Sequence, residues 1–161
     1  MNAVSELLRR SRVLDLGPLP APRLSANVTV QQALQFLVRG MRGAIVIVDG
    51  SRPIGVLTER DVLNRLPEEL FTSRERRRRT AVREIMSQPP ETVVRGASLS
   101  DALETMDRRQ HRHLVVVDRE GDLKGLLTTT DIVQFLTDQY PEETVNLPPR
   151  LRQEYRSSEG A

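Results

Sequence analysis

Cysteine and tryptophan are both missing from this chain of 161 residues, and aromatic residues make up only 3% of it. Without cysteine there is no disulfide, no thiolate metal site and no cysteine nucleophile, a composition that is typical of a reducing compartment. The scarcity of aromatic side chains removes the stacking surfaces that proteins bound to single-stranded nucleic acid usually present. We therefore expect a cytoplasmic protein whose function depends on neither thiols nor base stacking.

Long apolar runs and a large net charge are also lacking. No stretch is long and apolar enough for a membrane span, and the first twelve residues do not have the apolar segment of a signal peptide. The basic residues are almost all arginine, with Lys124 as the only lysine, and they nearly balance the acidic ones, at 24 against 22. The formal net charge of +2 is too small to indicate a polyanionic partner.

An internal repeat is the strongest feature that is present. Gly55–Asp61 reads GVLTERD, and Gly125–Asp131 reads GLLTTTD, 70 residues later. At an offset of 69 residues, the apolar positions of Thr29–Leu37 also match those of Ser98–Met106. Both of these segments have the i, i+3, i+4, i+7 spacing of an amphipathic helix, and both begin with the hydroxyl of a capping box. The chain therefore contains the same structural unit twice.

Two short apolar runs follow these helices. Ala44–Asp49 (AIVIVD) and Leu114–Asp118 (LVVVD) are too short for helices and rich in β-branched residues, which is typical of buried strands. After each run come a turn and a second apolar run, IGVLT or KGLLT, which can pair antiparallel with the first. Helical spacing then returns in TERDVLNRL and TTTDIVQFL. With a short strand at its start, each repeat reads strand, helix, strand, strand, helix.

The repeats and the polar segments around them predict the domain organisation. A unit of about 55 residues buries little apolar surface, so we expect the two repeats to pack against each other in an α/β (α+β) fold. The predicted parts are an N-terminal segment at 1–12, the first repeat at 13–68, a linker at 69–81, the second repeat at 82–138 and a polar C-terminal tail at 139–161.

A threonine and an aspartate, three residues apart, stand in both repeats where a strand passes into a helix. These pairs are Thr58 with Asp61 and Thr128 with Asp131. A hydroxyl at the N-cap and a carboxylate in the first turn satisfy free backbone N–H groups, so helix capping alone explains the pattern. The same geometry offers donors to a phosphate and a carboxylate to the two hydroxyls of a ribose. From the residues alone, both interpretations stay open.

The order and spacing of these segments resemble a tandem pair of CBS domains, often called a Bateman module. The second repeat carries the resemblance in VREIM, SLSDALETM, HRHLVVVD and GLLTTTDIV, and the first in TVQQAL, RGAIVIVD and GVLTERDVL. Together they cover about Val13–Asp138. The resemblance implies two βαββα units around a pseudo-twofold axis, a homodimer, and clefts between the units that bind adenosine-containing ligands such as AMP, ADP, ATP, S-adenosylmethionine or NAD.

The resemblance also implies which residues hold such a ligand. In each cleft the threonine hydroxyl would meet the phosphate and the aspartate the ribose, while residues at the start of the central strand would meet the phosphates or the base. Because Arg112 can pair with phosphate and Gly43 offers only its backbone, we expect the two clefts to be unequal. The implied ligand-binding residues are Thr58, Asp61, Gly43, Ala44, Thr128, Asp131, Arg112 and His113.

Other features offer little chemistry. The run Arg76–Arg79 can grip a polyanion, but the glutamates around it favour a solvated linker helix. Two histidines, His111 and His113, do not make a zinc site without further ligands. Phosphate-binding loops, nucleophile elbows and metalloprotease helices are absent from the sequence. We therefore expect no catalytic residue, no bound metal and no required cofactor.

The sequence predicts a stand-alone regulatory protein, not an enzyme, that binds an adenosine-containing ligand, most simply AMP, ADP or ATP. Its shape would report occupancy to an unknown partner protein, because a ligand shifts a protein toward the arrangement that it binds more tightly. Two alternatives stay open. One is a ligand-free oligomerisation scaffold whose threonine–aspartate pairs only cap helices, and the other is a nucleic-acid-binding protein that uses Arg76–Arg79.

Overall fold

The structure is a computed structural model that describes residues 2–40 and 42–140. The chain divides into two compact units at Thr129, and the second unit holds most of the last described helix. From position 141 onward, the predicted C-terminal tail lies outside the described residues. In the part of the chain that the structure describes, none of the helices has the length and apolar character needed to cross a membrane.

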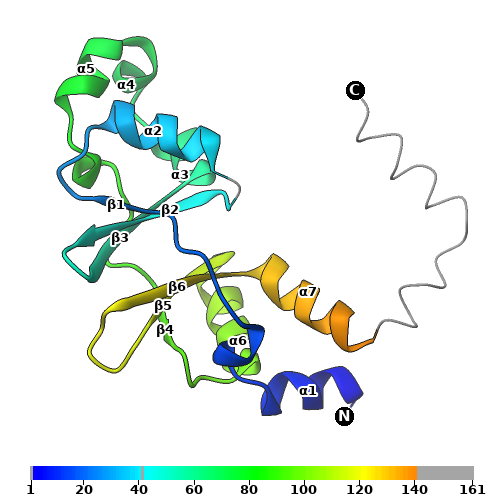
Figure 1. Cartoon of the computed structure of the whole chain (residues 1–161). Coiled ribbons are helices and arrows are strands. Elements are labelled where there is room, and N and C mark those ends of the chain that lie inside the picture. Colours follow the sequence, from blue (N-terminus) through cyan, green and yellow to red (C-terminus); the bar gives the residue numbers. More distant parts are fainter. Residues whose placement is uncertain (1, 41, 141–161) are drawn as a thin grey trace, which may run out of the picture. The chain divides into compact units, whose positions relative to one another are not determined.

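The first repeat has the predicted order of elements (Figure 1). Its strand β1 pairs parallel with β2, and β2 pairs antiparallel with β3, so the sheet order is β1-β2-β3. Its first helix begins at Thr29, which forms the predicted capping box with Gln32. The elements are β1 (Arg23–Ser25), α2 (Val30–Arg39), β2 (Ala44–Asp49), β3 (Arg52–Thr58) and α3 (Glu59–Arg65).

The second repeat has the same order and the same strand pairing, with a sheet of order β4-β5-β6. At the start of its first helix, the Ser98 hydroxyl accepts a hydrogen bond from the Asp101 N–H at 3.0 Å. The α+β fold of two βαββα repeats is thereby confirmed. The elements are β4 (Thr92–Val94), α6 (Leu99–Arg109), β5 (His113–Val117), β6 (Leu123–Thr128) and α7 (Thr129–Gln139).

Within the described residues 2–40 and 42–140, five short helices lie outside the two βαββα patterns. Two of them, α4 (Glu68–Thr72) and α5 (Arg74–Arg79), lie in the segment between the repeats that the sequence predicted as a linker. The other three are α1 (Ala3–Arg10) and two 3-10 helices, η1 (Val13–Leu16) and η2 (Val82–Glu84). Each 3-10 helix begins at a fully buried valine, and these two valines match each other in the sequence repeat.

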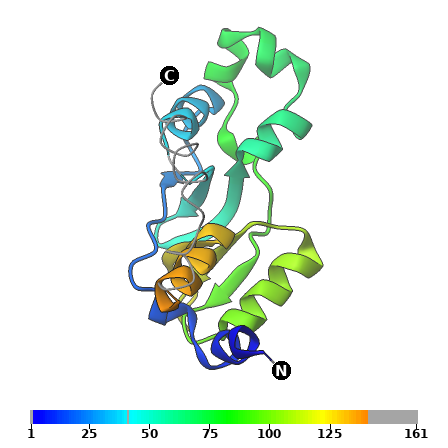
Figure 2. The same cartoon turned by 90° about the vertical axis from the view of Figure 1, so that its right-hand side faces the viewer.

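The lead-in segment of the first repeat, which is the chain ahead of β1, packs on the second repeat. Backbone hydrogen bonds run from Val13 N to Ala97 O at 3.0 Å and from Leu99 N to Ser11 O at 2.9 Å. Helix α1 also packs against α6, and Figure 2 shows these two helices side by side. The N-terminal residues are therefore part of the second repeat's structure.

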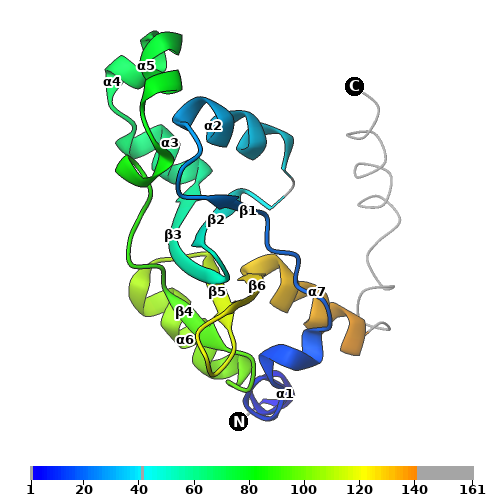
Figure 3. The ribbon, with the colours of Figure 1, turned by 60° about the vertical axis from the view of Figure 1, so that its left-hand side comes forward.

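The lead-in segment of the second repeat, which is the chain between α5 and β4, packs in turn on the first repeat. Val30 N donates to Thr80 O at 2.8 Å, and Val82 N donates to Val28 O at 2.9 Å. The side chain of Val82 lies in the apolar core on the α2 side of the first sheet. Each repeat is therefore completed by the residues that precede the other one, an exchange that Figure 3 shows from the side of the two sheets.

The same two segments continue along the outer edges of the hairpins. Val56 of β3 exchanges two backbone hydrogen bonds with Ser87, at 3.0 and 2.8 Å. In the other repeat, Leu126 N of β6 lies 3.4 Å from Leu19 O. These contacts cover both hairpin edges, which would otherwise expose unpaired N–H and C=O groups.

The central strand β2 is covered on both faces, as its continuous apolar run predicted. Ile45 and Ile47 point into the core beneath α2. Ala44, Val46 and Val48 alternate with them and point toward the other sheet, in a core that both repeats share. The buried members of this shared core are Ala44, Val46, Val48, Val115, Val117, Leu123 and Leu126.

The turn between β5 and β6 is held by Asp118. The backbone N–H of Asp122 donates to its carboxylate at 2.8 Å, and Lys124 forms an ion pair with it at 3.3 Å. Both interactions favour the charged form and lower the pKa of Asp118 below its ordinary value of 3.8, the hydrogen bond from Asp122 being the larger cause.

The substitution Asp118→Asn is therefore expected to cost stability at neutral pH and almost none in acid. Because the folded-state pKa is depressed, the carboxylate stabilises the fold above pH 3.8, and this contribution disappears as pH falls through the lower folded-state value. The measurement is the urea midpoint of both proteins from pH 7 down to pH 3. A difference in midpoint that stays constant over this range would contradict the assignment.

Candidate functional site

Thr58 and Asp61 form a complete capping box at the start of α3. The Asp61 N–H donates to the Thr58 hydroxyl oxygen at 3.0 Å. In return, Asp61 Oδ2 accepts from the Thr58 N–H at 3.0 Å and from the Thr58 hydroxyl at 2.9 Å. The capping interpretation of this pair is therefore confirmed, and it accounts for one of the two carboxylate oxygens.

The other oxygen of Asp61 faces the segment that leads into the second repeat and packs on the first. Asp61 Oδ1 accepts from the Ser87 hydroxyl at 3.2 Å and from Arg65 NH1 at 3.4 Å, and the same Arg65 nitrogen donates to the Ser87 hydroxyl at 2.6 Å. Ser87 belongs to the segment that leads into the second repeat. Only 16% of the Asp61 side chain is exposed, so this carboxylate lies in a half-buried polar cluster between α3 and the segment that leads into the second repeat.

Gly43 and Ala44 lie beside this helix start. Ala44, the first residue of β2, is the cross-strand partner of Thr58 at the end of β3. The Glu59 N–H donates to Gly43 O at 3.1 Å. Gly43 has a φ of +68°, so a larger residue at this position would strain the backbone. The structure thus brings together the four predicted residues of the first repeat.

The second repeat repeats this arrangement. His113 opens β5 and is the cross-strand partner of Thr128, which ends β6. The Thr129 N–H donates to Arg112 O at 3.2 Å, as Glu59 does to Gly43. Arg112 is exposed and Thr128 is buried. Asp131 lies in the first turn of α7, three residues beyond Thr128 and in the second compact unit.

The strand starts of the two repeats meet. His113 Nε2 lies 3.0 Å from Arg42 O, and the Arg42 guanidinium donates to Leu126 O. A Cβ atom on Gly43 would lie 3.9 Å from His113 Nε2. The predicted residues Gly43 and His113, which are 70 positions apart, are therefore neighbours, and both are half-buried.

Four residues at this junction were missed by the sequence analysis. Glu59 and Arg42 stand next to predicted residues in the chain, so the sequence offered a signal for them. Arg65 also had a local signal, because it follows Asp61 by four residues on α3 and forms an i, i+4 ion pair with it. Ser87 alone reaches Asp61 through the exchanged segment, and this exchange has no local signature.

The arginine run is largely engaged with the protein itself. Arg76 pairs with Glu69, and Arg79 pairs with Glu75 at 3.1 Å. Arg77 donates to the backbone oxygens of Leu70 and Phe71 and to the side chain of Gln31. The predicted solvated linker helix therefore describes Arg74–Arg79 better than a free basic strip does. Within residues 2–40 and 42–140, no three His, Cys, Asp or Glu side chains form a group that could hold a metal ion.

Comparisons with known proteins agree with the duplicated fold. The uncharacterized protein MK0525 of Methanopyrus kandleri is 29% identical over 114 residues, which are 67% of this chain and 53% of that protein. This chain therefore spans about half the length of that relative. The CBS domain-containing protein YhcV of Bacillus subtilis is 31% identical over 122 residues, which are 76% of this chain and 83% of that protein.

Among solved structures, the CBS domain protein PAE2072 from Pyrobaculum aerophilum, complexed with AMP, matches with a TM-score of 0.64 and 27% identity. The match covers 75% of this chain and 89% of that one. The family model of the CBS domain matches this sequence twice, at residues 15–68 and 82–138. Since these two matches cover more than half of the sequence, the chain belongs to the CBS domain family and carries a tandem pair of its domains.

Proposed function

We propose that this CBS pair is a regulatory module that binds an adenosine-containing ligand at the junction between its repeats. The observation that carries the proposal is the Asp61 carboxylate, whose second oxygen accepts hydrogen bonds from hydroxyl and guanidinium donors rather than from helix N–H groups. A ribose offers hydroxyl donors of the same kind. The AMP complex of the 27% identical Pyrobaculum aerophilum protein supports this choice of ligand.

In this proposal Asp61 Oδ1 binds ribose hydroxyls, while Oδ2 goes on capping α3. The Thr58 hydroxyl and the backbone around Gly43 lie at the same helix start and meet the phosphate, and the hydroxyl turns its proton from Asp61 Oδ2 to a phosphate oxygen when the ligand binds. In the second repeat, Thr128 corresponds to Thr58, and Arg112 and His113 add a cation and a donor beside it. Asp131 is proposed as a ligand-binding residue because it matches Asp61 in the sequence repeat. Ala44, the cross-strand partner of Thr58, contacts the ligand through its backbone.

Regulation follows from the position of Ser87. Because this residue belongs to the segment that leads into the second repeat, a ribose that takes its place on Asp61 changes the contact of α3 with that segment. A ligand shifts the arrangement of the repeats by as much as it prefers one arrangement over another. We propose that a homodimer of this module presents the change to a partner protein in the cytoplasm, without catalysing a reaction itself.

The substitution Asp61→Ala is expected to abolish ligand-induced stabilisation. A ligand at 100 times its dissociation constant adds about 2.7 kcal/mol to the stability of the protein that binds it. For a chain of this length that is a rise of roughly 5–10 °C in Tm. The measurement is a thermal-shift panel with AMP, ADP, ATP, S-adenosylmethionine and NAD on both proteins.

A matched control separates ligand binding from capping. Gln32→Ala removes the corresponding side-chain hydrogen bond of the capping box at the start of α2, and each variant is expected to lose about 0.5–2 kcal/mol of stability. The Gln32 variant should keep the full ligand-induced shift. If no compound raises the Tm of the unmodified protein, Thr58 and Asp61 serve as a helix cap alone, and the scaffold alternative takes the place of this proposal.

A further inference from the structure

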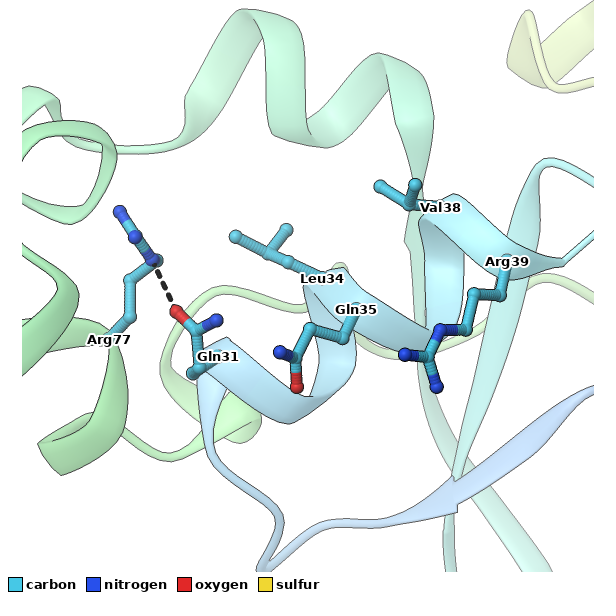
Figure 4. Close-up of a pocket in the computed structure, with 6 residues that line it drawn as sticks. All are labelled: Gln31, Leu34, Gln35, Val38, Arg39 and Arg77. Atoms are coloured by element: carbon cyan, nitrogen blue, oxygen red, sulfur yellow. Dashed lines mark hydrogen bonds between the residues drawn. The ribbon is translucent and has the colours of Figure 1, made fainter.

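A groove on the first repeat lies between α2 and α5, away from the junction described above (Figure 4). Most of its lining comes from α2, at positions three or four residues apart, so these side chains run along one side of that helix. In Figure 4, Arg77 reaches from α5 toward Gln31, near the first turn of α2. The lining residues are Gln31, Leu34, Gln35, Val38, Arg39 and Arg77.

The middle of the groove is apolar. Leu34 and Val38 stand one turn apart on α2, and Figure 4 shows both side chains pointing to the same side of the helix. Val38 is 84% exposed, which makes it the most exposed of the large apolar side chains in the part of the chain that the structure describes. Leu34 packs in part against Val30, Leu66 and Leu70, so the packing of the repeat explains its apolar side chain. No such packing explains the exposed aliphatic side chain of Val38.

A positive charge lies at each end of this apolar stretch. At one end, Arg77 is held in place by hydrogen bonds to Gln31 Oε1 at 2.7 Å and to Leu70 O and Phe71 O, both at 2.8 Å. None of these partners is a carboxylate, so the charge of Arg77 is positioned without being neutralised. In contrast, the neighbouring Arg76 is paired with a glutamate.

At the other end, Arg39 is the last residue of α2 and is exposed. No carboxylate of residues 2–40 or 42–140 forms an ion pair with it, and no acidic side chain lines the groove. Gln31, the partner of Arg77, and Arg39 are eight residues apart, which is about 12 Å along a helix that rises 1.5 Å per residue. The α2 residues that bind or carry the two cations are therefore about two helical turns apart, with Leu34 and Val38 between them in the chain.

We propose that this groove docks an acidic amphipathic helix of a partner protein. A helix lying along α2 would place carboxylates at positions i and i+7, close to the two cations, and aliphatic side chains at i+3 and i+4, on Leu34 and Val38. Charge complementarity favours an anionic occupant, and the apolar side chains of the groove favour a helix over a nucleic acid, which offers no aliphatic side chains. This inference does not depend on ligand binding at Asp61.

The test uses a fluorescein-labelled helical peptide of fifteen residues, with glutamates at i and i+7 and leucines at i+3 and i+4, titrated with the full chain by fluorescence anisotropy. Arg39→Glu and Val38→Asp are each expected to weaken binding roughly five- to tenfold at low salt. A second peptide, with lysine in place of the glutamate that faces position 39, should bind Arg39→Glu better than it binds the unmodified protein. The matched control is Arg74→Glu, an exposed residue of α5 outside the groove, which should leave binding unchanged.

Four results would overturn the proposal. The first is an unmodified chain that does not bind the peptide, and the second is an equal loss of binding in Arg74→Glu, which would indicate a diffuse positive field. The third is a single-stranded DNA oligonucleotide that displaces the peptide from the unmodified chain but not from Arg39→Glu. This result would mean that Arg39 binds nucleic acid. The fourth is a mass from sedimentation that halves in Val38→Asp, because the groove would then be an interface between two copies of this chain. Both variants change exposed side chains, so circular dichroism should show an intact fold.

Discussion

Alanine at position 125 is expected to destabilise this protein by roughly 1–3 kcal/mol. A Cβ atom on Gly125 would lie 2.7 Å from Leu19 O and 3.0 Å from the Leu19 Cβ, both closer than ordinary van der Waals contact. The first of these is a backbone atom of the segment that covers the edge of β6, so relief of the clash requires that the segment moves as a whole. The expected consequence is a fall in Tm of roughly 3–9 °C.

Gly55 occupies the matching position in the first repeat, and its substitution by alanine should cost less. Its Cβ atom would collide chiefly with the Met86 thioether, the far end of a flexible side chain, and would lie 3.0 Å from Ser87 O. A methionine can change its rotamer where a backbone carbonyl cannot. The order of the two losses therefore tests whether the close backbone contact is the cause.

Gly96→Ala is the matched control for both substitutions. A Cβ atom on Gly96 meets nothing within 4 Å, so its replacement should change the urea midpoint very little. Equal destabilisation by alanine at positions 96 and 125 would mean that the loss comes from backbone flexibility and not from the contact with Leu19. The repeated glycine of GVLT and GLLT would then need another explanation.

The elements of each repeat were predictable because their signals are local. The helix spacing of Thr29–Leu37 and Ser98–Met106, the hydroxyls at their starts and the β-branched runs after them all lie within a few residues of what they determine. The observed α2, α6, β2 and β5 fall on these segments. Because each element is determined by residues within it or next to it, the order of the elements could be predicted from one sequence.

The exchange of the lead-in segments could not be predicted in the same way. Val13 and Val82 match each other in the repeat, and both are buried at the start of a 3-10 helix. Nothing in the local sequence says whether such a residue packs on its own repeat or on the other one, because both offer the same kind of surface. The structure shows the second arrangement, with Val13 bonded to Ala97 and Val82 bonded to Val28.

The candidate site was predictable in part for the same reason. The pairing of Thr58 with Asp61 is local, and the sequence located it together with Ala44 across the hairpin. The contact of Asp61 with Ser87 depends on the exchanged segment, so it was not accessible. The sequence therefore predicted the helix cap at Asp61, but it did not predict the second contact of this carboxylate, with Ser87.

Leu126→Ala is expected to have the largest effect on stability, a loss of roughly 2–5 kcal/mol. Leu126 is fully buried, and its side chain lies in the core shared by the two sheets, where it packs with residues of β2 and β5. A cavity at this position removes apolar contacts from both repeats at once. Because the repeats also exchange their lead-in segments, we expect them to lose stability together.

Hydrogen exchange of individual backbone amides measures this coupling. If the shared core makes the first 129 residues one cooperative unit, the free energy of opening should fall equally in β2 and in β5, although the substitution is in β6. Leu63→Ala, at a side chain that is 78% exposed, should change neither strand. A loss of protection limited to β5 and β6 would show that each repeat is stable by itself. The contact between the repeats would then be too weak to transmit ligand binding from one repeat to the other, so this experiment also decides whether the proposed regulation is physically possible.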